Sequence, residues 1–221
     1  MNSGSSTPYR HIIWDWNGTL IDDTAVCLEI TNSMLRERGL PEVAIAAHRD
    51  LFDLPVSRYY ERIGFDFSTD PMAVLNAEFA ETYEQRRAEC FLHHPASAFL
   101  GGLAARGYAQ SVLSAYPHQA LVGAISHFRL TELFSGLFGH LETFAGSKIA
   151  RGADCLAATG YDPEEVLIVG DTVHDWEVAT HLGTGCILLS HGHQSRKRLE
   201  KCGGPVVDSL PDLETYLPGI F

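Results

Sequence analysis

Apolar and polar residues follow two different rhythms along this chain. Short apolar runs bounded by turn residues predict strands, whereas longer segments with apolar residues every three or four positions predict helices. The two kinds of segment alternate over most of the chain, which is typical of a parallel sheet flanked by helices. The predicted strands are residues 11–16, 108–113, 165–171, 185–190 and 205–208, and the predicted helices are residues 95–106, 117–128, 148–159, 174–182 and 211–217, the third capped by Ser147.

Residues 22–90 show a different pattern. Their segments are helical and polar-faced, with turn signals at residues 39–41, 64 and 68–71, and they contain no clear strand. We therefore expect an all-helical insertion of roughly 65 to 70 residues after the first strand, long enough for a small core of its own.

Composition excludes several classes of protein. The 221 residues carry a formal net charge of −12, whereas a nucleic-acid surface needs clustered Lys and Arg. The five cysteines form no C-x-x-C pair, which indicates reduced thiols and a cytoplasmic location. We see no signal peptide and no apolar run near the ~20 residues that a membrane span needs. We expect a monomer or a homodimer with no membrane partner.

Polar side chains stand directly after three of the predicted strands. Asp15 follows HIIW, Ser114 follows SVL and Asp171 follows VLIVG. Ligands of open parallel sheets bind beyond the carboxyl ends of the strands. Asp175 lies one helical turn past Asp171 and can face the same place.

Three clustered carboxylates repel each other unless a cation lies between them, and ligands that are all oxygens favour Mg²⁺. A carboxylate held this way can attack a phosphate and form an aspartyl-phosphate. Gly18 and Thr19 allow a tight turn whose backbone N–H groups are expected to point at phosphate oxygens. Ser114 offers a neutral donor to the same phosphate, so the set suits phosphoryl transfer.

Lys148 is notable because the chain has only three lysines. The other two lie in SRKRLEK, which indicates a solvated helix face. Lys148 opens a predicted helix, where a cation opposes the helix dipole. This placement indicates an anionic partner.

These residues resemble a known family. DWNGTL, the strand-end Ser114, Lys148 and GDTVHD match, in order and spacing, the four motifs of the haloacid dehalogenase-like hydrolases. The resemblance covers about residues 10–217. The long interval after the first motif resembles the branch with a helical cap, which includes phosphoglycolate phosphatases and β-phosphoglucomutases.

The resemblance implies an α/β fold with a Rossmann-like three-layer core, residues 1–21 and 91–221, and a helical cap domain, residues 22–90. It implies a Mg²⁺-dependent phosphatase acting on a small phosphorylated metabolite, with phosphoglycolate as the family default. The implied roles are Asp15 as the nucleophile, Asp171 and Asp175 as ligands of Mg²⁺, and Ser114 and Lys148 as the groups that bind the transferring phosphoryl group.

Asn17 departs from the family pattern. The family's phosphatases have Asp there, which carries protons and gives its backbone carbonyl to Mg²⁺. Asn keeps the carbonyl but not the proton transfer, which is typically worth about 10²–10⁴-fold.

Four hypotheses follow from Asn17. The substrate has a good leaving group, such as an acyl phosphate, or a nearby group such as His174 carries the proton; the sequence favours these two. Otherwise a substitution introduced at this position traps a complex, or the protein binds a phosphorylated ligand without turnover.

Two other members of the family also lack Asp at this place. Phosphonoacetaldehyde hydrolases use a cap lysine, but residues 22–90 contain no lysine. Haloacid dehalogenases need no metal, which leaves the acidic residues of GDTVHD unexplained. The dehalogenase remains a minor alternative.

Several further residues were candidates. Arg58 resembles a cap arginine that meets the substrate in some members of the family. His191 and His193 have loose spacing for zinc, which favours no metal role. Trp14 and Trp16 alternate with Asp15 along the strand, which predicts core packing.

Overall fold

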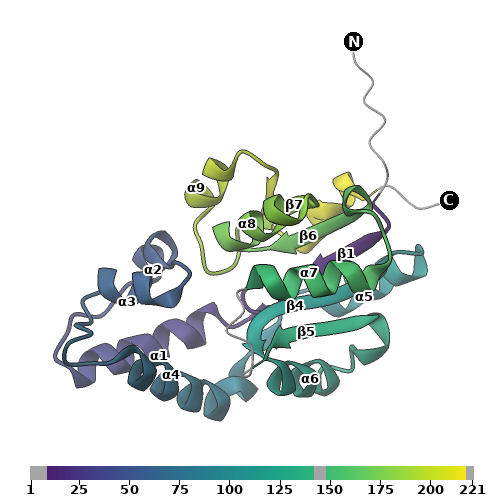
Figure 1. The fold of residues 1–221 in the computed structure, drawn as a ribbon. Coiled ribbons are helices and arrows are strands. Elements are labelled where there is room, and N and C mark those ends of the chain that lie inside the picture. The colour runs from purple at the N-terminus through teal and green to yellow at the C-terminus, as the bar shows by residue number, and fades with distance from the viewer. Residues whose placement is uncertain (1–8, 142–147, 218–221) are drawn as a thin grey trace.

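The computed structural model describes residues 9–141 and 148–217, and its centre is a six-stranded sheet (Figure 1). The strand order is β5-β4-β1-β6-β7-β8, and all neighbouring strands are parallel. The strands are β1 (His11–Trp14), β4 (Ala109–Pro117), β5 (Gly136–His140), β6 (Val166–Gly170), β7 (Gly185–Leu189) and β8 (Val206–Val207).

Helices cover both faces of this sheet, and β1 shows why. Ile12 and Trp14 belong to one apolar cluster, whereas Ile13 belongs to another on the opposite face. Because side chains alternate along a strand, a fully apolar strand must be covered on both sides. The covering helices are α5 (Ala96–Ala105) and α6 (His118–His127) on the first face, and α7 (Lys148–Thr159) and α8 (Val173–Leu182) on the second. The expected three-layer α/β core is confirmed.

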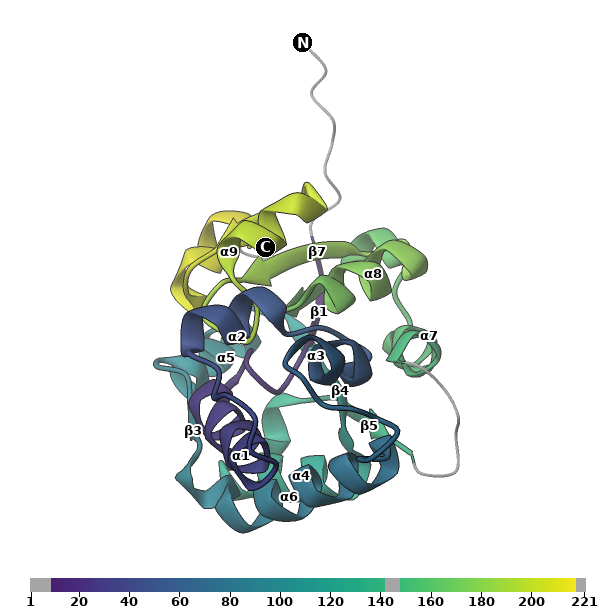
Figure 2. The same cartoon turned by 90° about the vertical axis from the view of Figure 1, so that its left-hand side faces the viewer.

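A second, helical part follows the first strand. It lies between β2 (Ile21–Asp22) and β3 (Phe91–Leu92), which pair antiparallel and connect it to the core. Figure 2 shows its helices grouped in front of the sheet. They are α1 (Thr24–Glu37), α2 (Ile45–Leu51), α3 (Val56–Arg62), α4 (Met72–Arg86) and the 3₁₀ helix η1 (Arg87–Glu89).

The two parts share apolar contacts. One buried cluster extends from Trp14 and Trp16 of the core to Tyr60 and Leu75 of the helical part. Both tryptophans are fully buried, so their predicted role in core packing is confirmed.

Three sequence predictions need correction. The segment Gly136–His140 was not predicted as a strand, because GLFGH is short and holds two glycines. The strand predicted for residues 108–113 continues to Pro117 across a register shift. The last helix is a 3₁₀ helix, η5 (Leu210–Tyr216), rather than the α-helix predicted for residues 211–217. Ser147 lies outside the described residues.

The remaining short elements are α9 (Arg196–Leu199), η2 (Thr131–Leu133), η3 (Pro163–Glu165) and η4 (Glu200–Cys202). Among the described residues, no helix combines the length and the apolar character needed to cross a membrane.

Candidate functional site

Three carboxylates meet where β1 and β6 end. These strands are parallel neighbours, and the N–H of Asp15 donates to the Val169 carbonyl at 2.8 Å, which aligns the two strand ends. Asp171 follows β6, and Asp175 lies in the first turn of α8. Oxygens of the three carboxylates lie within 4.8 Å of one another, and all three residues are buried. The predicted meeting of Asp15, Asp171 and Asp175 is confirmed.

Lys148 bridges two of these carboxylates. Its Nζ donates to Asp175 Oδ1 at 2.6 Å and also contacts Asp15 Oδ1. Burial alone would lower the pKa of Lys148, but the charges of Asp15 and Asp175 outweigh it and raise that pKa. The anionic partner expected for Lys148 therefore includes the carboxylate cluster itself.

One lysine does not neutralise this cluster. Burial raises the pKa of Asp15 to about 8, although Lys148 opposes the shift. Burial likewise raises the pKa of Asp171 to about 6. For Asp175, burial also acts upward, but Lys148 and hydrogen bonds from Thr172 outweigh it and lower the pKa. Buried carboxylates with too little positive charge between them fit a hard divalent cation such as Mg²⁺.

The loop after β1 closes tightly over this cluster. Gly18 has φ +74°, and a Cβ there would lie 2.4 Å from Asp171 Oδ2, so no other residue fits without a shift. The Thr19 hydroxyl donates to Asp171 Oδ1 at 2.8 Å. The expectation that the N–H groups of Gly18 and Thr19 point at a phosphate is wrong for this structure. The Gly18 N–H donates to Asp23 Oδ1 at 2.9 Å, and the Thr19 N–H to the Trp16 carbonyl.

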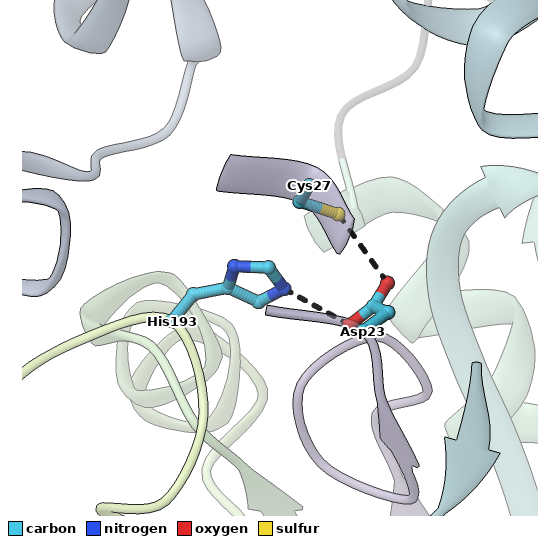
Figure 3. Close-up of side chains that lie close together, drawn as sticks. All are labelled: Asp23, Cys27 and His193. Carbon is cyan, nitrogen blue, oxygen red and sulfur yellow. Dashed lines mark hydrogen bonds and ion pairs between the residues drawn. The ribbon is translucent and has the colours of Figure 1, made fainter. Parts of the chain in front are cut away.

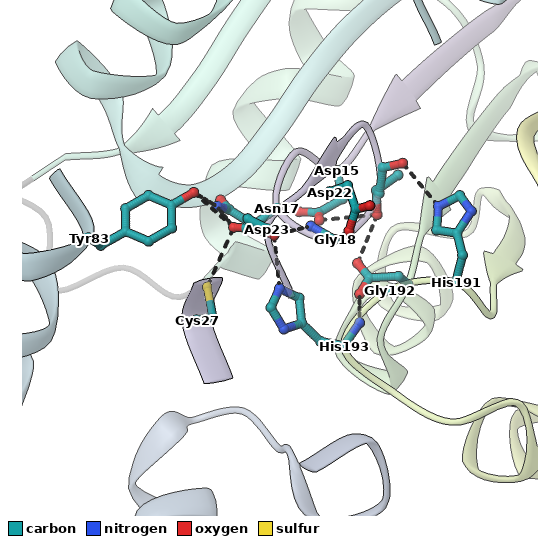
Figure 4. Close-up of polar contacts among 12 residues, drawn as sticks. Asp15, Asn17, Gly18, Asp22, Asp23, Cys27, Tyr83, His191, Gly192 and His193 are labelled. Carbon is teal, nitrogen blue, oxygen red and sulfur yellow. Dashed lines mark hydrogen bonds and ion pairs between the residues drawn. The ribbon is translucent and has the colours of Figure 1, made fainter. Parts of the chain in front are cut away.

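Asp23 is the hub of a buried network that the sequence did not reveal (Figures 3 and 4). Its side chain is 0% exposed. Burial alone would raise the pKa of Asp23, but hydrogen bonds from His193, Asn17 and Tyr83 outweigh it and lower that pKa. Its carboxylate accepts from Asn17 Nδ2 at 2.7 Å, Tyr83 OH at 2.8 Å, Gly18 N at 2.9 Å, His193 Nε2 at 3.2 Å and Cys27 Sγ at 3.6 Å.

Asn17 lies within this network. The amide donates to Asp23 and to Tyr83 OH at 3.0 Å, and its oxygen lies 3.5 Å from Ser114 Oγ. Tyr83 belongs to α4, so the same contacts hold the helical part against the loop that carries Asp15. Asn17 is therefore a hydrogen-bond donor to a buried anion, a role that an ionised Asp could not fill.

His193 belongs to the site through hydrogen bonds, a role that its sequence context did not reveal. Its backbone N–H donates to Asp171 Oδ2 at 2.7 Å. Its ring nitrogens contact Asp23 Oδ1 at 3.2 Å and His48 Nε2 at 3.4 Å, so both are engaged. Burial alone would lower the pKa of His193, but Asp23 outweighs it and raises that pKa. Through these contacts His193 holds the loop after β7 against Asp171 and Asp23.

Of three other candidates, one contacts this arrangement and two lie outside it. His191 Nε2 lies 3.2 Å from the Thr19 carbonyl oxygen, and its ring stacks on His93 with centroids 3.8 Å apart (Figure 4). His174 bonds to Glu177 at 3.1 Å and does not line the cavity described below. Arg58 is exposed on α3 and is not part of the cavity lining, so the structure does not bring it to the site.

A cavity of about 380 Å³ opens above Asp15. Its floor is polar and includes Asp15, Asn17, Ser114 and Lys148, all of them candidates from the sequence. Its walls come from the helical part and from the end of β4. The wall side chains include Phe52, Leu54, Val56, Tyr59, Tyr60, Phe79, Tyr83 and Tyr116.

Comparison with known proteins agrees with this geometry. A family model described as haloacid dehalogenase-like hydrolase matches residues 12–189. Phosphoglycolate phosphatase from Aliivibrio fischeri is 25% identical, with 91% of this chain and 90% of the relative covered. Phosphoglycolate phosphatase 1 from Pseudomonas aeruginosa is 24% identical, with 92% and 78% covered.

Solved structures show the same fold. A predicted phosphatase from Clostridium acetobutylicum superposes with a TM-score of 0.79 at 17% identity, over 95% of this chain and 98% of that one. A haloacid dehalogenase-like family hydrolase from Streptococcus pneumoniae gives 0.76 at 17% identity, over 95% and 99%. Since the family model spans most of the sequence and both strand-end carboxylate motifs fall within it, the chain belongs to the haloacid dehalogenase-like hydrolases.

Proposed function

We propose that the protein is a Mg²⁺-dependent phosphatase that hydrolyses a small phosphorylated metabolite through an aspartyl-phosphate on Asp15. The observation that carries this proposal is the Asp15 carboxylate, which lies on the cavity floor in contact with Lys148 and within 4.8 Å of the carboxylates of Asp171 and Asp175. The phosphoglycolate phosphatases among its relatives support the reaction class.

In this proposal Asp15 attacks the phosphorus, and the bond from phosphorus to the leaving oxygen breaks. Lys148 and Ser114 line the same floor and hold the oxygens of the transferring group. Water then attacks the phosphorus of the aspartyl-phosphate, which returns Asp15 as a carboxylate and releases inorganic phosphate. The Thr19 side chain, bound to Asp171, supports the cluster and does not need to touch the substrate.

The metal ligands we propose are Asp15, Asp171, Asp175 and the backbone carbonyl of Asn17. A bound Mg²⁺ would neutralise the charge that develops on the phosphoryl oxygens. The chain's own contribution is to hold these carboxylates at fixed positions through Lys148 and Thr172.

We expect Mg²⁺ to stabilise the protein. A ligand that binds only the folded state adds about 2.7 kcal/mol to the free energy of unfolding when its concentration is 100 times its Kd. Differential scanning calorimetry with 10 mM MgCl₂ (about 100 times a Kd in the 0.1 mM range) should therefore show a higher melting temperature.

Asp171→Asn should abolish that shift, whereas Asp50→Asn, which removes an exposed carboxylate of α2, should leave it unchanged. A wild-type protein whose melting temperature ignores millimolar Mg²⁺ would contradict the metal site.

A screen of phosphorylated metabolites with and without Mg²⁺, read out as released phosphate, tests the activity. The second candidate function is a phospho-ligand-binding protein, which the loss of the proton carrier at Asn17 favours. Turnover of p-nitrophenyl phosphate separates the two, because its leaving group needs little acid help. A dehalogenase needs no metal, so the buried cluster of Asp15, Asp171 and Asp175 disfavours that function.

All five cysteines are free, which supports the proposed cytoplasmic location. The oligomeric state, monomer or homodimer, remains a prediction.

A further inference from the structure

The walls of the cavity above Asp15 are aromatic and hold one another in place. Phe79 stacks on Tyr83 with centroids 6.0 Å apart, and Tyr83 meets Tyr116 edge-on at 5.7 Å. Elsewhere in the lining, Phe52 meets Tyr59 edge-on at 5.4 Å. Aromatic rings in mutual contact form a pre-organised apolar surface.

The tyrosine side chains that line the cavity are neutral. Burial raises the pKa of Tyr59, Tyr60 and Tyr83 above the ordinary value. Burial lowers the pKa of His48 to about 3, so its ring also carries no charge.

The cavity offers no free cation to a second anionic group. Every Lys and Arg of the sequence lies within residues 9–141 and 148–217, and of these only Lys148 lines the cavity. Lys148 is already bound to Asp15 and Asp175, and the His193 ring is paired with Asp23. Glu84 also lines the cavity, but its carboxylate pairs with Arg87 at 3.4 Å and accepts a hydrogen bond from the Tyr116 hydroxyl, so it offers no binding partner to an anion.

The leaving group of phosphoglycolate carries a carboxylate. In this cavity the carboxylate would meet aromatic rings and the already paired Glu84, with neutral donors such as Asn76 for hydrogen bonds. Burying a charge without a charged partner is costly. The lining therefore disfavours the substrate that the relatives' names suggest.

Asn17 gives a second, independent reason to expect an aromatic ester as the substrate. Its amide cannot give a proton to the leaving oxygen, and both ring nitrogens of the neighbouring His193 are engaged. An aryl oxide leaves as a stabilised anion and needs no proton, whereas an alkoxide does.

Resting on the proposed phosphatase function, we propose that the site takes phosphate monoesters of uncharged phenols. The ring packs among Phe52, Phe79 and Tyr83 while the phosphate lies over Asp15. The aryl oxygen leaves with the electron pair of its bond to phosphorus, and Asp15 forms the new bond. Water then releases inorganic phosphate, so the products are the phenol and phosphate.

The test compares four monoesters at saturating Mg²⁺: phenyl phosphate, benzyl phosphate, ethyl phosphate and 2-phosphoglycolate. We expect kcat/KM for phenyl phosphate to exceed that for 2-phosphoglycolate by about 10²-fold or more. Benzyl phosphate has an aromatic ring but leaves as an alkoxide. It should therefore show a lower KM than ethyl phosphate at a similarly low kcat, which separates ring recognition from leaving-group chemistry.

Substitutions in the cavity wall test where the aromatic ring of the substrate binds. Phe79→Ala should raise KM for phenyl and benzyl phosphate about tenfold and leave KM for ethyl phosphate unchanged. Phe91→Ala is the matched control, because Phe91 lies on β3 with 70% of its surface exposed and does not line the cavity. An equal change for all four esters in Phe79→Ala would indicate a folding effect and contradict ring recognition.

A kcat/KM for 2-phosphoglycolate equal to or above that for phenyl phosphate would overturn this inference and leave the proposed phosphatase intact. Absence of Mg²⁺-dependent phosphate release from every ester would instead contradict the phosphatase. In that case calorimetric titration with phenyl phosphate and 2-phosphoglycolate decides the inference, which requires tighter binding of the aromatic ester.

Discussion

Asp15→Asn is expected to lower the rate of phosphate release by about 10⁴-fold or more, because it removes the proposed nucleophile and a group of this kind acts as a unit with its neighbours. The fold should remain intact. Burial raises the pKa of Asp15 to about 8, so its ionised form is less stable in the folded than in the unfolded protein. That carboxylate therefore destabilises the fold increasingly as the pH rises above its ordinary pKa of 3.8.

An uncharged amide removes this cost while Lys148 keeps Asp175 as its partner. In the absence of Mg²⁺ the melting temperature of Asp15→Asn should thus equal or exceed that of the wild type at pH 7. Steady-state phosphate release from p-nitrophenyl phosphate and a thermal melt check the two parts separately. Full activity in Asp15→Asn would exclude the aspartyl-phosphate, and Asp50→Asn should match the wild type in both measurements.

The carboxylate site could be predicted because its residues are marked by local pattern. Asp15 and Asp171 each end an apolar run, and parallel neighbouring strands must bring such ends together. Asp175 follows from helical spacing alone. Lys148 was identified because lysine is scarce in this chain.

The network around Asp23 could not be predicted by such reasoning. Tyr83 lies 60 residues further along the chain and His193 lies 170 residues further, and neither stands in a distinctive motif. The contacts exist only because α4 and the loop after β7 both fold back onto the loop after β1. The one available signal was the second acid of GTLIDD, since Asp next to an apolar helix start is rarely buried without partners.

The substrate preference could not be predicted from the sequence pattern either. Phe52, Phe79 and Tyr116 come from three separate segments, and each resembles ordinary core in its own context. Arg58 looked more informative than any of them, yet it lies outside the cavity. Phosphoglycolate was the default that the resemblance implied, whereas the assembled walls favour an uncharged ring.

The environment of Asn17 changes what its replacement should do. Asn17→Asp places a second carboxyl group at the 2.7 Å contact with Asp23, where the amide now donates. Two carboxyls this close cannot both ionise, so they must share a proton. The lost donor to a buried anion should lower the free energy of unfolding by about 1–3 kcal/mol.

The double variant Asn17→Asp/Asp23→Asn is expected to avoid this loss in the free energy of unfolding. The amide at position 23 then donates to the carboxylate at position 17, while its oxygen still accepts from the Gly18 N–H and His193, which hold Asp23 Oδ1 now. A carboxyl group at position 17 also restores a proton carrier beside the leaving oxygen. The double variant should therefore hydrolyse ethyl phosphate about 10²-fold faster than the wild type, with little change for p-nitrophenyl phosphate.

The dependence of rate on leaving-group pKa is the decisive measurement. It should be steep in the wild type and shallow in the double variant. The wild type should also show a burst of p-nitrophenol, because water attack on the aspartyl-phosphate lacks its base too. Asp23→Asn alone is the matched control, since it alters the same network without adding a proton carrier and should keep the steep dependence. If the double variant is no faster than Asp23→Asn on ethyl phosphate, the missing proton is not what limits alkyl esters. Asn17 would then serve to bind Asp23 and Tyr83, and the slow step would lie elsewhere in the site.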